Sequence, residues 1–144
     1  MNEIAEKLRA QLIRDEGKVA HAYQDSLGYW TIGVGHLIDK AKGGALPDFI
    51  IDTLLEHDIE KHKRELIAAL PWFTDLDPPR QAVLVNMAFN LGTAGLLKFT
   101  NTLRAIRSGS YSEAAMHMLE SKWATQVGVR AQRLAAQMET GVWQ

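Results

Sequence analysis

The spacing of apolar and polar positions divides the chain into helical stretches and one strand-like stretch. Four apolar residues near the N-terminus recur at the spacing of an amphipathic helix: Ile4, Ala5, Leu8 and Leu12. Gly17 is typical of a helix end. The period then changes, because HAYQDSLGYWTIGVGH (residues 21–36) is short, aromatic, β-branched and interrupted by glycines. This stretch predicts a small antiparallel hairpin, with a possible third strand through residues 37–38.

The rest of the chain has the period of helices. From Pro47 an apolar stripe continues for about six turns opposite dense charge, which predicts a long helix that links two lobes. Asp77 is a candidate N-cap for the next helix, which is apolar on most sides and is therefore expected at the centre of the C-terminal lobe. Three shorter helices are predicted after it: 96–107, 112–121 with Ser112 as its cap, and 126–140 ending at Gly141.

The predicted fold class is therefore α+β and mostly helical, with two lobes. A small antiparallel sheet lies in the N-terminal lobe, a long helix links the lobes, and the C-terminal lobe is helical. We expect one domain of 144 residues. Its N-terminal lobe covers about 13–60, and its C-terminal lobe covers about 71–144, with the helix of residues 1–12 packed on the latter.

Composition excludes several classes of site. There is no cysteine, so disulfides and thiolate metal sites are excluded. His57 and His62 are five residues apart on a predicted helix, whereas a zinc-binding helix places two histidines four apart, so no metal and no cofactor are expected. No nucleic-acid module appears, and no window approaches the roughly 18 apolar residues of a membrane span. The N-terminus also lacks the pattern of a signal peptide, so we expect a protein without an export signal.

Charge is distributed unevenly along the chain. Residues 1–75 hold 9 Lys and Arg against 13 Asp and Glu, a net charge of −4. Residues 76–144 hold 7 against 4, a net charge of +3. The basic part is suited to an anionic partner, and ordinary surface scatter explains the numbers equally well.

Three polar residues around the predicted hairpin suggest acid–base chemistry. Glu16 ends the first helix, where the negative end of the helix dipole favours the protonated carboxyl group. Asp25 follows nine residues later, and Thr31 lies on the returning strand. One protonated and one ionised carboxyl group across a cleft are the apparatus of glycoside hydrolysis, and a hydroxyl group can position water. From spacing alone, a solvated helix end and a turn aspartate remain the alternative.

Several motifs, in order, resemble the phage T4-type lysozymes of glycoside hydrolase family 24. They begin with Glu16, Asp25 and Thr31 in the pattern Glu-x8-Asp-x5-Thr and continue over nearly the whole chain: RDEG, YQDSLGYWTIGVGHL, NMAFNLG, FTNTLR, EAAMHML, SKW and TGVW. The resemblance implies a two-lobed muramidase that hydrolyses the β-1,4 bond between N-acetylmuramic acid and N-acetylglucosamine in peptidoglycan. It implies that Glu16 is the general acid, that Asp25 supports the transition state and activates water, and that Thr31 assists.

The resemblance also implies roles for residues outside this triad. Four residues match positions that line the saccharide groove, although structural packing explains each of them equally well: Leu37, Phe89, Thr102 and His117. Arg130 matches an arginine that reaches across the groove to the catalytic glutamate. His36 and Asp58 resemble a structural ion pair.

The expected biological role is that of a phage endolysin in host cell lysis. It would act as a monomer on peptidoglycan glycan strands, without stable membrane insertion. It would stay in the host cytoplasm until a holin or another membrane lesion gives access to the wall and periplasm. The alternatives are a lytic transglycosylase, a tail-associated or bacterial effector enzyme of the same chemistry, and a catalytically silent wall-binding module.

Overall fold

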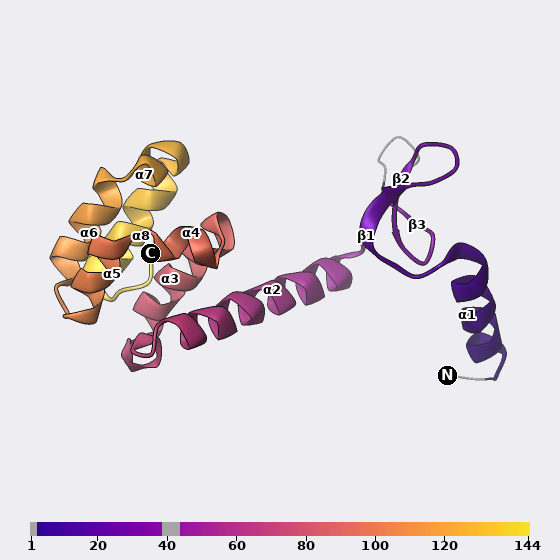
Figure 1. Cartoon of the computed structure of the whole chain (residues 1–144), viewed down its shortest axis with the longest axis horizontal. Helices are drawn as coiled ribbons and strands as arrows, with labels where there is room; N and C mark the ends of the chain where they lie inside the picture. Colours follow the sequence, from indigo (N-terminus) through magenta and orange to yellow (C-terminus); the bar gives the residue numbers. More distant parts are fainter. Residues whose placement is uncertain (1–2, 39–43) are drawn as a thin grey trace. The chain divides into compact units, whose positions relative to one another are not determined.

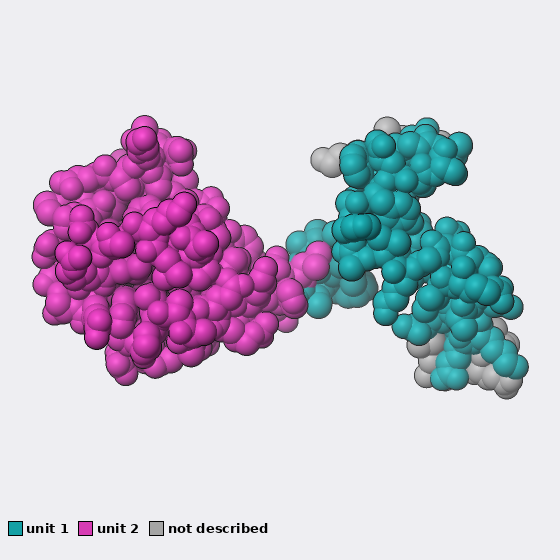
Figure 2. All heavy atoms as spheres, viewed as in Figure 1, with its two compact units in different colours: residues 1–53 teal, residues 54–144 magenta. Residues whose placement is uncertain are grey.

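The computed structural model describes residues 3–38 and 44–144 and divides the chain into two compact units. Unit 1 is Met1–Thr53 and unit 2 is Leu54–Gln144, coloured separately in Figure 2. The boundary between the units falls inside helix α2, Asp48–Ala69, the long helix predicted from Pro47 onward. The lobe limits of 13–60 and 71–144, and the packing of residues 1–12 on the second lobe, stay predictions.

Unit 1 contains helix α1, a small sheet and the first residues of α2 (Figure 1). Helix α1, Glu3–Glu16, ends at Gly17, whose φ of +80° lies in the left-handed region that glycine enters without steric cost. The three antiparallel strands are β1 (Val19–Gln24), β2 (Trp30–Gly33) and β3 (His36–Leu37), in the order β1-β2-β3. The hairpin and the third strand predicted from the sequence are thereby confirmed.

The register of the sheet places residues 25–29 at a tight turn. Tyr23 pairs with Thr31, and Thr31 pairs in turn with Leu37 on β3. An irregularity interrupts the pairing of β1 between Val19 and Tyr23. Bulges of this kind bend a strand and increase its twist, so β1 reaches the turn at an altered angle.

Unit 2 consists of the rest of α2 and a set of shorter helices. After the 3₁₀ turn η2 (Phe73–Asp75) come α3 (Pro78–Leu91), α4 (Thr93–Leu97), α5 (Thr100–Arg107), α6 (Tyr111–Glu120), α7 (Lys122–Val127) and α8 (Val129–Thr140). Asp77 is the N-cap of α3 as predicted, because its carboxylate accepts a hydrogen bond from the Arg80 N–H.

One hydrophobic core holds unit 2 together. Its largest fully buried side chains come from α2, η2 and most of the following helices: Leu66, Phe73, Val83, Leu84, Met87, Leu96, Ile106, Met118 and Met138. Helix α3 contributes Val83, Leu84, Met87 and Ala88 to this core, which confirms its predicted central place. Its other face, with Asn86 and Phe89, is exposed.

Polar groups join the beginning of α3 to the end of α8. The Arg80 guanidinium donates to the carbonyls of Met138 (2.7 Å) and Glu139 (2.9 Å) and lies 3.6 Å from the centre of the Tyr111 ring. The buried Gln137 amide donates to the Pro79 carbonyl at 2.8 Å. The two Arg80 bonds satisfy carbonyl groups that the last turn of α8 leaves without partners in the helix.

Three predicted helix limits in this unit are wrong. The helix predicted at 96–107 is two helices, because Phe99 leaves the helical region (ψ 59°) and packs edge-on against Trp123. The helix predicted at 126–140 is broken at Gly128, whose φ of 58° and ψ of −120° suit glycine. Ser112 is not a cap; it lies in the first turn of α6, where its hydroxyl donates to Glu139 at 3.0 Å.

Candidate active site

Glu16, Asp25 and Thr31 all belong to unit 1, and the sheet places two of them on either side of one turn. Asp25 follows β1 directly, and Thr31 lies on β2 beside Leu37 of β3. Glu16 is the last residue of α1 and is exposed.

The Asp25 carboxylate is fixed by the backbone of its own turn. Oδ1 accepts hydrogen bonds from the N–H groups of Leu27 (2.9 Å) and Tyr29 (2.8 Å). The Asp25 N–H donates to the Tyr29 carbonyl at 2.8 Å, which closes the hairpin. Among the described residues, Oδ2 accepts no hydrogen bond. One oxygen therefore sets the orientation of the carboxylate, and the other is available to a water or a substrate.

Thr31 is oriented through the same residue of the turn. Its hydroxyl donates to the Tyr29 carbonyl at 3.1 Å, and only 3% of the residue is exposed. Because that hydrogen bond uses its proton, the hydroxyl oxygen keeps its lone pairs to accept from a water. The backbone of Tyr29 thus links Asp25 and Thr31, a connection that the spacing of the two residues did not reveal.

Glu16 lies against the turn between β2 and β3. A Cβ atom added at Gly35 would come within 2.9 Å of Glu16 Oε2, and Gly35 has a φ of +64°. Glycine at this position therefore leaves the space in which the carboxyl group lies. Within the described part of the chain, no hydrogen bond holds that exposed carboxyl group.

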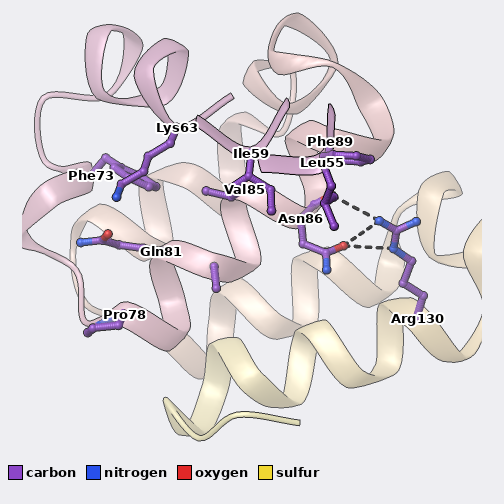
Figure 3. A pocket seen from close by; sticks show the side chains of 11 residues that line it. Leu55, Ile59, Lys63, Phe73, Pro78, Gln81, Val85, Asn86, Phe89 and Arg130 are labelled. Carbon is purple, nitrogen blue, oxygen red and sulfur yellow. Dashed lines mark hydrogen bonds between the residues drawn. The ribbon is translucent and has the colours of Figure 1, made fainter. Parts of the chain in front are cut away.

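The three residues predicted to support the site have other partners in the structure. The His36 Nε2 lies 2.7 Å from the Ala45 carbonyl, and the Asp58 carboxylate lies 3.2 Å from His57 Nδ1. Arg130 donates two hydrogen bonds to the Asn86 side chain, at 3.0 and 2.7 Å (Figure 3). The contacts of His36 with Asp58 and of Arg130 with Glu16 stay predictions.

Phe89 borders a cavity of about 500 Å³ in unit 2 (Figure 3). Leu55 and Ile59 of α2 and Val85 of α3 give the cavity apolar walls, and Asn86 with its Arg130 partner gives it a polar edge. With 43% of its surface exposed, Phe89 presents an apolar ring that suits the face of a sugar.

Thr102 and His117 lie together at a second, more polar recess of about 240 Å³. Thr102 is only 2% exposed, about as buried as Thr31. His117 lies between two carboxylates, with Nε2 3.4 Å from Glu113 and Nδ1 3.7 Å from Glu120. Asn101 borders the same recess, and no periodicity in the sequence singled it out.

The residues that the structure describes contain neither a candidate metal site nor a helix that could span a membrane. In residues 3–38 and 44–144, no three His, Asp or Glu side chains are grouped so that they could hold a metal ion. The same ranges contain no helix with both the length and the apolar character needed to cross a membrane.

Comparison with known proteins connects this geometry to an enzyme class. The family model "Phage lysozyme" matches residues 14–139. Two proteins of Dictyostelium discoideum, Probable T4-type lysozyme 2 and Probable T4-type lysozyme 1, are 29% and 26% identical over 160 residues. Each alignment covers 93% of this chain and 94% of the relative. The pre-baseplate central spike protein Gp5 of Enterobacteria phage T4 is 31% identical over 96% of this chain and 28% of its own length.

Proposed function

This chain belongs to the phage lysozyme family and is a glycoside hydrolase of the lysozyme type, and from that premise we propose that it cleaves one bond of bacterial peptidoglycan. The bond is the β-1,4 linkage between N-acetylmuramic acid and N-acetylglucosamine. The observation that carries the proposal is the turn at Tyr29. The Tyr29 N–H donates to the Asp25 carboxylate and the Tyr29 carbonyl accepts from the Thr31 hydroxyl, in the sheet that follows Glu16 in the chain.

In the proposed reaction, Glu16 donates its proton to the glycosidic oxygen while the bond from that oxygen to the sugar C1 breaks. Asp25 stabilises the positive charge that develops at C1 and takes a proton from the attacking water, whose oxygen bonds to C1. Thr31 accepts a hydrogen bond from that water through its free lone pairs. The products are a new reducing end and a free 4-hydroxyl group, and inversion of C1 is the expected stereochemistry.

Digestion of purified sacculi tests the bond and the acid together. Mass spectrometry of the fragments is expected to show reducing N-acetylmuramic acid ends. Glu16→Gln is expected to reduce the rate by about 10²- to 10⁴-fold, because it cannot donate the proton. Asp15→Asn is the matched control, since Asp15 is the adjacent carboxylate, 59% exposed and bonded to Arg14. Equal rates for the two variants would refute the assignment of Glu16.

The same digest separates the alternatives. A lytic transglycosylase would leave 1,6-anhydro ends in place of reducing ends, which would refute hydrolysis by a water held at Asp25 and Thr31. A catalytically silent wall-binding module would leave the sacculi uncut and bound to the protein.

The biological setting is a separate proposal, that of an endolysin in host cell lysis. We propose a monomer that stays in the host cytoplasm until a holin or another lesion opens the membrane. Expression with and without a membrane lesion tests this, because lysis or periplasmic protein without the lesion would contradict it. A single peak of about 16.1 kDa in light scattering is expected for the monomer.

A second candidate setting is a tail-associated enzyme, which the similarity to the spike protein Gp5 favours. The chemistry would be identical, and the setting would differ. Detection of the protein in purified virions by mass spectrometry would support the tail-associated role, whereas its restriction to lysates would support the endolysin.

A further inference from the structure

His62 of α2 lies against the ring of Phe89 at the end of α3. The two ring centres are 5.7 Å apart and the planes are tilted by 57°, a geometry typical of attractive aromatic pairs. Of the His62 side chain 16% is exposed, against 43% of the Phe89 residue. His62 therefore forms a largely buried support, and Phe89 keeps an open surface.

Packing alone does not favour histidine at this position. His62 Nδ1 is buried and has no hydrogen-bond partner among the described residues. The nearest carboxylate oxygen, Glu65 Oε2, lies 3.8 Å away, beyond hydrogen-bond distance. A buried polar atom without a partner costs stability, so a purely apolar ring would fit this position with less cost.

Glu65 and Trp123 fix the segment that carries Phe89. The Thr93 hydroxyl, at the first residue of α4, donates to Glu65. The Trp123 indole N–H donates to the Asn90 side chain at 2.8 Å. With His62 against Phe89, neighbouring helices contact residues 89–93 at three points, and the contact at His62 is the one made with the Phe89 ring.

We propose that His62 is a positioning residue for saccharide binding, which acts through its ring to hold the Phe89 ring in the direction that stacks on a sugar face. This inference rests on the proposed function, in which Phe89 contacts the glycan strand. The contact between the two rings holds Phe89 in position, whereas the buried, unpaired His62 Nδ1 lowers the stability of the fold.

Steady-state kinetics on soluble, uncrosslinked glycan chains of peptidoglycan test the inference. His62→Ala is expected to raise KM by roughly 2- to 10-fold with kcat unchanged, the range that corresponds to one aromatic pair. His62→Phe keeps the ring and removes the unpaired nitrogen, so it is expected to restore KM and to raise Tm. His57→Ala, on the exposed side of the same helix, is the matched control and is expected to leave KM and Tm unchanged.

Phe89→Ala and the double variant separate the two proposals. If Phe89→Ala leaves KM unchanged, Phe89 does not bind the saccharide and the premise fails. If Phe89→Ala raises KM and His62→Ala does not, only the inference about His62 is refuted. If both raise KM, His62→Ala is expected to add nothing in the Phe89→Ala background, and additive effects would refute positioning through the ring. A His62→Phe enzyme as weak as His62→Ala would refute it as well.

Discussion

Asp25 holds the turn in the structure, and the proposed function gives it a second, separable role in catalysis. Its Oδ1 accepts hydrogen bonds from the N–H groups of Leu27 and Tyr29. In the proposed reaction, its negative charge stabilises the positive charge that develops at C1 in the transition state. Asp25→Asn keeps an acceptor oxygen for both N–H groups and removes the charge. Asp25→Ala removes the acceptor as well, so the two variants are expected to differ in stability and to agree in lost activity.

The structure sets the size of the difference in stability. Each hydrogen bond to a charged acceptor contributes about 1.5–3 kcal/mol and each to a neutral acceptor about 0.5–1.5 kcal/mol. Asp25 is half-buried, so the lower ends of both ranges apply. We therefore expect Asp25→Ala to destabilise unit 1 by about 3 kcal/mol and Asp25→Asn by about 2 kcal/mol.

Urea unfolding, monitored by hydrogen exchange of the strand amides, measures the stability of unit 1 separately from that of unit 2. The turnover of sacculi measures the second role, and both variants are expected to lose at least about 100-fold in rate. Equal destabilisation by Asn and Ala would show that Oδ1 does not hold the turn. An active Asp25→Asn enzyme would show that the charge is not required, and the role given to Asp25 would be wrong.

Two further predictions concern a glycine and a carboxylate. Gly35→Ala is expected to displace the Glu16 carboxyl group and lower kcat, because its Cβ would meet Oε2 at 2.9 Å. Gly33→Ala is the control, since it has a similar φ (+71°) with nothing within 4 Å, so equal kcat values would contradict the collision. The pKa of Glu65 lies below its ordinary value of 4.5, chiefly because its carboxylate accepts a hydrogen bond from the Thr93 hydroxyl. This hydrogen bond therefore stabilises the fold at pH values above 4.5, and the stabilisation is lost as the pH falls through the lowered pKa. Thr93→Val is therefore expected to lower Tm more at pH 7 than at pH 3, and a pH-independent difference would refute the linkage.

The sequence predicts the elements that depend on local signals. Gly17 ends α1, the glycine-interrupted stretch forms the sheet, and Asp77 caps α3, because each of these features is set by residues within a few positions. The lysozyme assignment likewise rests on ordered motifs, and the family match confirms it.

Contacts between distant residues explain what the sequence did not predict. Phe99 breaks a helix because it packs on Trp123, and Ser112 bonds Glu139, 27 positions away, where a cap was predicted. At the cavity beside Phe89, the pairing of Arg130 with Asn86 joins residues 44 apart. Helical periodicity reports which face is apolar and gives no information about partners on other helices.

The bonds from Arg80 to the carbonyls of Met138 and Glu139 have a consequence for synthesis of the protein. They join residues that are 58 and 59 positions apart in the sequence. Helix α8 must therefore emerge from the ribosome before Arg80 of α3 can form these bonds. Until then the nascent helices expose the apolar surface that α8 will cover, and a chain cut short before Met138 is expected to be a substrate for proteases.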